Sequence, residues 1–236
     1  MEAIVMAAGE GRRLWPVTER WPKPILPIDG RPVVAVALRE LRAAGCQRVT
    51  VVTGYLAEQV ESLLGNGSGF GLELRYARQP RPDGSADAVS RALAAGAGPP
   101  LLVATADTVF RPGDPGRFAV AFARAEAAGA VAIRRDPPPG PQRAGVEVDG
   151  GVVSRIVAAA QTETPFAHAS LWGLGPELTS YLDRLAGPPF ELAEAYQRAI
   201  DDGLRVSAFE VGPTRDLTDP LDLVQENFAY LNQTDE

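Results

Sequence analysis

Apolar positions along the chain follow two alternating patterns, short runs typical of strands and helically spaced positions typical of amphipathic helices. The runs predict strands at 2–7, 49–52, 101–105 and 130–133. Alternating apolar and charged residues predict a half-exposed strand at 72–76. Helical spacing predicts helices at 32–44, 57–64, 85–95 and 116–128, with Gly45 ending the first of them. Because strands and helices alternate with short connections, we expect an α/β fold with a Rossmann-like, doubly wound, mostly parallel sheet. Ligands of such sheets bind along the edge where the strands end.

The alternation changes after Asp136. A proline-rich loop at 137–141 leads to short strands at 145–148 and 152–157, joined by a hairpin-like turn, Asp149-Gly150-Gly151. The remaining pattern predicts strands at 166–172 and 204–210 and helices at 176–185, 191–202 and 220–231. Nearer the start, prolines between Arg12 and Pro27 exclude a continuous helix, so this segment is expected to be a long structured loop.

Composition narrows the class of protein. A formal net charge of −7 argues against a surface that coats nucleic acid, which needs a basic face. No apolar run approaches the roughly 20 residues of a membrane helix, and the short apolar start is not typical of a secretory signal. A single cysteine, Cys46, excludes an internal disulfide and favours a reducing, cytoplasmic location. Its expected role is that of a small buried side chain.

The most informative stretch is a glycine turn that follows the first strand. Gly9 and Gly11 precede Arg13, and Lys23 follows between prolines. Lys23 is the chain's one lysine among 23 basic residues. Glycines let backbone N–H groups approach phosphate oxygens, while an arginine fork and a lysine charge bind the same oxygens. A purely structural tight turn is the alternative interpretation.

Two common glycine-loop motifs do not fit this stretch. The dinucleotide fingerprint needs a third glycine, where this chain has Leu14, and a helix that opens from the loop. The prolines prevent that helix. The phosphate loop of NTPases ends in Gly-Lys-Ser/Thr, whereas Gly11 is followed by Arg12 and Arg13.

This stretch resembles the sugar-1-phosphate nucleotidyltransferases, the nucleotide-sugar pyrophosphorylases. Their motif, Gly-x-Gly-x-Arg followed later by Pro-Lys, appears here as Gly9, Gly11, Arg13 and Pro22-Lys23. The resemblance implies a fold of the nucleotide-diphospho-sugar transferase type. It also implies that Arg13 and Lys23 are catalytic, and that the residues binding the nucleotide include those of the glycine turn: Ala8, Gly9 and Gly11.

Further matches follow along the chain. Gly54-Tyr55 with Glu58 is similar to the family's Gly-Tyr-x-x-Glu. Residues 79–84 are similar to the base-reading segment of glucose-1-phosphate thymidylyltransferases, in which Gln79 and Gly84 would contact the base. The same residues also fit a turn that caps a helix.

Two aspartates resemble the family's metal ligands. Asp107 stands just past a buried strand, and Asp216 lies in a looser match to Asp-x-Gly-Thr-Pro, where Asp219 also fits an N-cap. The resemblance implies that Asp107 and Asp216 hold Mg²⁺.

The acceptor half departs from the family pattern. Arg143-Ala144-Gly145-Val146 is similar to the sugar-site segment, and Ser170 stands where the family has glycine, so Gly145 and Ser170 are the expected acceptor-binding residues. The family's Glu-Lys-Pro is replaced at 157–160 by Val-Ala-Ala-Ala. His168 lies beside this segment, and a lone histidine is more often structural.

The resemblance predicts one domain, 1–236, with a nucleotide-binding half at 1–136, an acceptor-binding subregion at 137–212 and a metal-ligand loop with a C-terminal helix at 213–236. It implies Mg²⁺-dependent transfer of a nucleotidyl group from a nucleoside triphosphate to a sugar 1-phosphate, with release of pyrophosphate. One alternative is a cytidylyl- or uridylyltransferase that acts on phosphocholine or an inositol phosphate. Another is a non-catalytic nucleotide-binding homologue. No nucleic acid or membrane partner is expected, and a homo-oligomer is left open.

Overall fold

The computed structural model describes residues 1–135, 145–157 and 164–228. Its main strands are β1 (Glu2–Ala7), β4 (Arg48–Thr53), β5 (Glu73–Arg78), β6 (Leu101–Thr105), β8 (Gly129–Arg135), β9 (Gly145–Asp149), β10 (Val152–Val157), β11 (Phe166–Leu174) and β12 (Val206–Glu210). Four two-residue strands are β2 (Pro27–Ile28), β3 (Arg31–Pro32), β7 (Thr108–Val109) and β13 (Arg215–Asp216). The helices are α1 (Val33–Ala43), α2 (Ala57–Leu64), α3 (Ser85–Ala94), α4 (Asp114–Arg124), α5 (Thr179–Leu182), α6 (Leu192–Asp201) and α7 (Pro220–Asn227).

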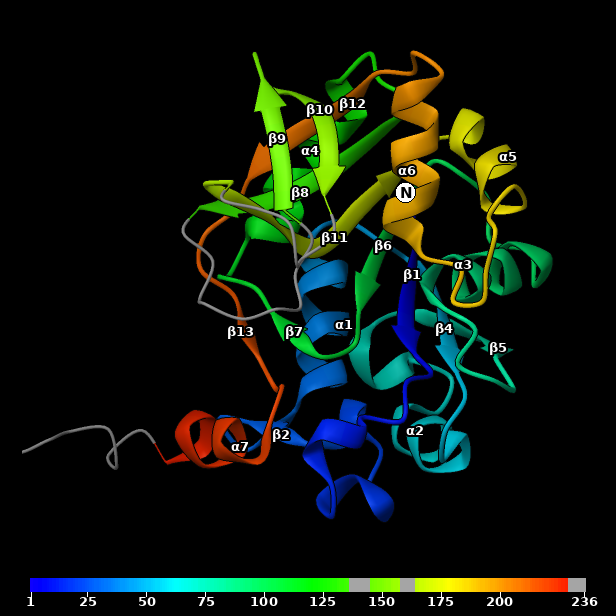
Figure 1. The fold of residues 1–236 in the computed structure, drawn as a ribbon. Helices are drawn as coiled ribbons and strands as arrows, with labels where there is room; N and C mark the ends of the chain where they lie inside the picture. Colours follow the sequence, from blue (N-terminus) through cyan, green and yellow to red (C-terminus); the bar gives the residue numbers. More distant parts are fainter. Residues whose placement is uncertain (136–144, 158–163, 229–236) are drawn as a thin grey trace, which may run out of the picture.

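The nine main strands form one sheet with helices on both faces (Figure 1). Its order is β5-β4-β1-β6-β11-β8-β12-β10-β9. The first four strands are parallel, and β8 pairs in parallel with β12. β11 runs antiparallel to both neighbours, and the β9–β10 hairpin is antiparallel as well. The Rossmann-like α/β fold class is confirmed. Parallel pairing is confined to the first four strands of the order and to the β8–β12 pair.

Each face of the sheet buries its own apolar core. On one face α3, α5 and α6 pack over strand residues such as Trp172, whose ring meets Tyr196 at 4.9 Å between centroids. On the other face α1, α2 and α4 contribute residues such as Leu38, Val60 and Phe118, which are fully or almost fully buried. Cys46 is buried in this second core, as expected for a structural thiol. The two cores hold the strands in register and thereby fix the edge at which they end.

A third, smaller apolar cluster anchors the proline-rich loop at that edge. Its buried members are Leu14, Leu26, Ile28, Val33 and Leu217. The loop itself consists of three short 3₁₀ turns, at Arg12–Leu14, Val17–Glu19 and Lys23–Ile25. The loop predicted from the prolines is therefore ordered by packing against the segment between β13 and α7.

Several predicted boundaries were wrong by a few residues. The helix expected at 176–185 is a 3₁₀ turn, Pro176–Leu178, followed by α5, and the helix expected to reach 128 ends at Arg124. After α5 the chain turns so that the Phe190 backbone can bond to Asp83 and Ala86, a tertiary contact that helical spacing cannot encode. The predicted loop at 137–141 and residues 229–231 of the last helix lie outside the described residues. No helix in the described part of the chain is long and apolar enough to span a membrane.

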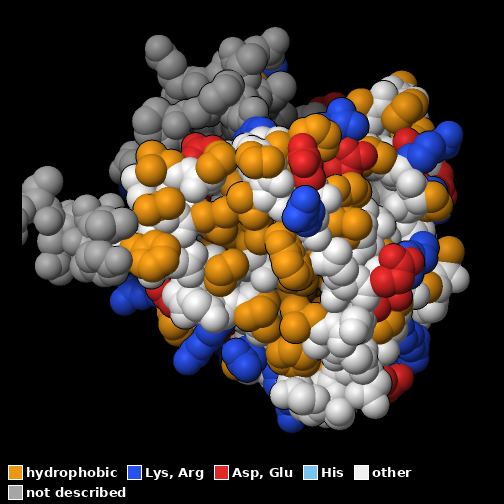
Figure 2. Space-filling model, turned by 90° about the horizontal axis from the view of Figure 1, so that it is seen from below, with side chains coloured by type: hydrophobic (Ala, Val, Ile, Leu, Met, Phe, Trp, Pro, Cys, Tyr) orange, Lys and Arg blue, Asp and Glu red, His pale blue; other side chains and the backbone are white. Residues whose placement is uncertain are grey.

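The lower end of the molecule in Figure 1 carries the proline-rich loop and α7, and Figure 2 shows apolar side chains gathered over it. A groove of about 790 Å³ lies there, and its lining includes Trp21, Ile25, Pro27 and Leu63. Trp21 is 55% exposed. This apolar groove shares no lining residue with a second cleft, which is lined by residues that include Gly9, Lys23 and Asp107.

Candidate active site

The glycine turn after β1 forms one wall of a cleft at the carboxyl edge of the sheet. Ala8 is buried, and its carbonyl accepts the Tyr55 N–H at 3.2 Å. A Cβ on Gly9 would meet no atom within 4 Å, so backbone at this position faces open space. Gly11 has a φ of +63°, and a Cβ there would lie 3.2 Å from side-chain atoms of Lys23 and Thr18. Glycine therefore serves two purposes here, open backbone at Gly9 and a left-handed turn at Gly11.

The two predicted cations line the same cleft, which has a volume of about 320 Å³. Its lining includes Gly9, Gly11, Arg13, Lys23 and Asp107. The Lys23 side chain is only 13% exposed, and its ammonium pairs with the Asp107 carboxylate. Arg13 is exposed and forms no ion pair with any described residue. The cleft thus offers one cation, Arg13, that no carboxylate of the described residues neutralises, beside a second, Lys23, that is held by Asp107.

Asp107 is held in its charged form at the end of β6. Burial raises the pKa of its carboxyl, but the charge of Lys23 and hydrogen bonds from Lys23, Thr105 and the backbone together lower that pKa by more. The net result is a pKa below the ordinary value. A carboxylate at this place is therefore ionised at neutral pH.

Asp216 reaches the same edge through a two-residue strand pair. β13 pairs with β7, so that Asp216 stands opposite Thr108. The Thr108 hydroxyl donates to Asp216 Oδ1 at 2.6 Å and lies 3.5 Å from Asp107 Oδ1. The Thr214 hydroxyl donates to Asp216 Oδ2 at 3.2 Å, and buried Arg134 lies 3.9 Å from the same oxygen. The structure brings together two carboxylates that are 109 positions apart in the sequence.

The donor set fits Mg²⁺ in one particular mode. Among the described residues no group of three or more acidic, histidine or cysteine side chains could hold a metal ion. Mg²⁺ is commonly held by one or two carboxylates together with substrate phosphates and waters. Asp107 and Asp216, at one edge beside a cleft lined by Arg13 and Lys23, match that mode.

The predicted base-reading residues lie beside the glycine turn. Gly54 separates Gln79 from Ala8, since a Cβ on Gly54 would be 2.7 Å from the Gln79 carbonyl and 2.8 Å from the Ala8 carbonyl. Gln79 is buried and its Nε2 donates to the Gly84 carbonyl at 2.9 Å. Gly84 has a φ of +110°, and a Cβ there would meet the Phe190 backbone. Contact of Gln79 and Gly84 with a base stays a prediction, and the alternative helix-capping turn is also present, because α3 begins at Ser85.

The residues predicted to bind the acceptor lie farther along the sheet. Gly145 begins β9 and pairs with Ala167 of β11. Ser170 has a φ of +58°, the left-handed conformation that glycine adopts without strain. This left-handed conformation agrees with the position of Ser170, where the family pattern has a glycine. Since Leu171 pairs with Ala104, Ser170 lies beside the end of β6, close to Thr105 of the cleft.

His168 has local structural contacts on β11. Its Nδ1 accepts the Ser170 N–H at 3.3 Å, and its ring lies 5.2 Å from the ring of Trp172. Arg143 and residues 158–160, which carry the sugar-site match and the lost Glu-Lys-Pro, lie outside the described residues.

Three neighbours of the site were not predicted from the sequence. Thr108 connects the two aspartates, and Asp87 with Arg91 holds Gln79. The four-residue spacing of Asp87 and Arg91 on a helix is a recognisable ion-pair pattern. Nothing in the sequence indicated the role of Thr108, because two-residue strands leave no periodicity.

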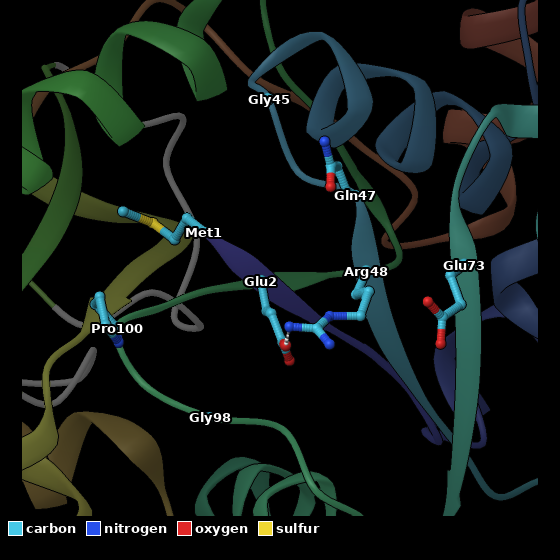
Figure 3. A pocket seen from close by; sticks show the side chains of 8 residues that line it. All are labelled: Met1, Glu2, Gly45, Gln47, Arg48, Glu73, Gly98 and Pro100. Carbon is cyan, nitrogen blue, oxygen red and sulfur yellow. Dashed lines mark ion pairs between the residues drawn. The ribbon is translucent and has the colours of Figure 1, made fainter.

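A pocket of about 690 Å³ lies at the opposite edge of the sheet (Figure 3). Its lining residues include Glu2 and Arg48, which form an ion pair at the start of β1 and β4. Ligands of α/β sheets bind at the carboxyl ends of the strands, and this pocket lies at the amino ends. The smaller cleft beside the glycine turn is therefore the better candidate site.

The fold and the cleft together define an α/β protein with a cationic, carboxylate-bearing site at the carboxyl edge of its sheet. The nucleotidyl transferase family model matches residues 2–157, and the chain belongs to that family. This confirms the resemblance found in the glycine turn.

Individual relatives agree with this assignment. The chain is 26% identical over 239 residues to the low-salt glycan biosynthesis nucleotidyltransferase Agl11 of Haloferax volcanii, a match that covers 98% of this chain and 66% of that protein. It is 35% identical over 112 residues to the N-acetylmuramate alpha-1-phosphate uridylyltransferase of Neisseria meningitidis, covering 46% of this chain and 48% of that protein. The structure of a UDP-glucose pyrophosphorylase complexed with UDP-glucose superposes with a TM-score of 0.81 at 20% identity, covering 99% of both chains.

Proposed function

We propose that the chain transfers a nucleotidyl group from a nucleoside triphosphate to a sugar 1-phosphate, giving a nucleotide sugar and pyrophosphate. The observation that carries this proposal is the convergence of Gly9, Gly11, Arg13 and Lys23 on one cleft with Asp107. Family membership and relatives named as nucleotidyltransferases support it. The proposed substrates are small molecules of the cytoplasm, so we propose that the chain works there.

In this reaction an oxygen of the acceptor phosphate attacks the α-phosphorus of the nucleoside triphosphate. A bond forms between that oxygen and the α-phosphorus, the bond from the α-phosphorus to the bridging oxygen breaks, and pyrophosphate leaves. The acceptor phosphate is ionised at neutral pH, so no general base is required. The protein's contribution is to position the two substrates and to stabilise the charge that develops between them.

Each residue of the cleft has a distinct part in this proposal. Open backbone at Gly9 leaves room for N–H groups to approach phosphate oxygens, and Gly11 supplies the left-handed turn that shapes the loop. Arg13 offers two parallel donors, and Lys23 offers a compact charge. Asp107 and Asp216 would hold Mg²⁺, which neutralises phosphate charge as a Lewis acid when bound.

The direct test is release of pyrophosphate from a panel of UTP, dTTP, CTP, ATP and GTP with glucose 1-phosphate, N-acetylglucosamine 1-phosphate and other sugar 1-phosphates. At least one pair should give pyrophosphate and a nucleotide sugar, and chelation of divalent metal by EDTA should stop the release. Nucleotide binding without pyrophosphate release from any acceptor, phosphocholine and inositol 1-phosphate included, would instead establish a non-catalytic homologue.

A second candidate is a cytidylyl- or uridylyltransferase for another phosphorylated acceptor. It is favoured by the acceptor half of the sequence, where Ser170 replaces a glycine of the family pattern. That half also contains no lysine, because the chain's one lysine, Lys23, lies in the nucleotide-binding half. Phosphocholine and inositol 1-phosphate belong in the same panel for this reason. A rate with either that exceeds the rate with every sugar 1-phosphate would establish this second function.

A further inference from the structure

The side-chain amide nitrogen of Gln79 is held by two hydrogen-bond acceptors. Its Nε2 donates to the Gly84 carbonyl at 2.9 Å and to Asp87 Oδ2 at 2.7 Å. A primary amide has two N–H donors, so these two bonds use both of them. The orientation of the amide follows, because a rotated amide would place its oxygen against a carbonyl and a carboxylate. Only the acceptor oxygen Oε1 remains for a ligand.

Asp87 is itself fixed by a cation on the next turn of α3. Arg91 Nε donates to Asp87 Oδ2 at 2.7 Å, the same oxygen that receives the Gln79 donor. The Asp87 side chain is 18% exposed. Burial raises the pKa of Asp87, but hydrogen bonds from Arg91 and Gln79 and the charge of Arg91 lower it to below the ordinary value. Asp87 therefore presents a permanent acceptor to Gln79 at neutral pH.

A fixed acceptor distinguishes pyrimidines by their ring nitrogen. N3 of uracil and thymine carries a hydrogen and donates, whereas N3 of neutral cytosine is itself an acceptor. When N3 of the base faces Gln79 Oε1, cytosine would place two acceptors against each other, and a buried polar mismatch of this kind strongly disfavours binding. The location fits a base site, since Gln79 lies next to the glycine turn across Gly54.

We propose that Asp87, clamped by Arg91, is a positioning residue for base selection. It fixes the Gln79 amide so that, among pyrimidine nucleotides, the site accepts those whose base has a ring N–H, uridine or thymidine, and rejects cytidine. This inference rests on the proposed function for its location at the nucleotide site, and it names the nucleotide class that the reaction uses.

The test compares kcat/KM for UTP and CTP with the best acceptor of the panel. The wild-type chain should prefer UTP by about a hundredfold or more. Asp87→Ala removes an acceptor and leaves Arg91, a donor-only group, near the amide, which favours the rotated amide. The UTP preference should then fall at least about tenfold, a loss of roughly 1.4 kcal/mol.

Two further variants separate positioning from general damage. Asp87→Asn can keep an oxygen at the position of Oδ2 and should retain most of the preference. Glu194→Ala removes the acid of another four-residue pair, with Arg198 on α6, and should leave the ratio unchanged. The ratio between two nucleotides is insensitive to the fraction of folded enzyme, so a merely structural role for Asp87 would not alter it.

The outcomes are distinguishable from failure of the proposed function. A wild-type preference for CTP, or an unchanged ratio in Asp87→Ala, overturns the inference even when pyrophosphate is released. If no pair releases pyrophosphate, the proposed function fails, and dissociation constants for UTP and CTP still test base selection. Should Asp87→Ala not fold, the wild-type ratio decides, with a UTP preference supporting the inference and a CTP preference refuting it.

Discussion

Replacing Lys23 by alanine tests the proposed chemistry most directly. Lys23 is the chain's one lysine, its side chain is 13% exposed, and it pairs with Asp107 inside the cleft. Removing one preorganised donor from a transition-state site typically costs 10²- to 10³-fold in kcat, about 2.7–4 kcal/mol of barrier. We expect a loss of that size in the rate of pyrophosphate release.

The fold should survive the same substitution. Breaking a fully buried ion pair costs about 3–5 kcal/mol, whereas an exposed pair contributes about 1 kcal/mol or less. The Asp107 side chain is 31% exposed, so water can hydrate the carboxylate that Lys23 leaves behind. The decrease in the free energy of unfolding should therefore lie nearer about 1 kcal/mol than about 3–5 kcal/mol. This is well within the roughly 5–15 kcal/mol by which domains are stable.

The assay is steady-state pyrophosphate release, with urea denaturation measured on the same preparation. Arg48→Ala is the matched control, because Arg48 also pairs with a carboxylate, Glu2, but in the pocket at the opposite edge (Figure 3). Arg48→Ala should keep the wild-type rate. If Lys23→Ala turned over at a near-normal rate while folded, the proposed role of the cleft would be refuted.

Three further predictions concern stability. Ser170→Gly should raise the free energy of unfolding by about 0.5–1 kcal/mol in urea denaturation, because Ser170 has a φ of +58° and glycine relieves that strain; no gain would show that its contacts already offset the strain. Gly84→Ala should lower it by about 1–3 kcal/mol, since the new Cβ would lie 2.3 Å from the Phe190 carbonyl; a neutral effect would show that residue 190 moves freely. The pKa of Asp87 is lowered in the folded state, so its stabilisation is present above the unfolded pKa of about 3.9 and is lost as the pH falls through the folded value. The stability difference between wild type and Asp87→Asn should accordingly shrink as the pH falls below the unfolded pKa in urea titrations, and a constant difference would contradict the assignment.

Much of the fold could be predicted from local pattern. Helical spacing gave α2 its observed bounds, 57–64, and apolar runs located the core strands to within a few residues. The N-cap expected at Asp219 is also present, because its side chain accepts the N–H groups of Leu221 and Asp222 at the start of α7. These features depend on neighbours within one or two turns of chain, which the sequence specifies directly.

Strand direction could not be predicted in the same way. β11 runs antiparallel between β6 and β8, yet its apolar run is the kind that a parallel central strand would also have. Both directions bury the same side chains, so the apolar pattern does not distinguish them.

For the site, the sequence by itself determined the chemical inventory: the glycine turn, Arg13, the one lysine, the two aspartates and Gln79. Only the tertiary structure decided how they meet. The β7–β13 pair places Asp216 opposite Thr108, and α3 brings Asp87 against the Gln79 amide. For Asp216 the physical reason is range, because its contact with Thr108 joins segments 108 positions apart. Asp87 is only eight positions from Gln79, but the turn between β5 and α3 brings the two together, and neither strand nor helix periodicity records that turn.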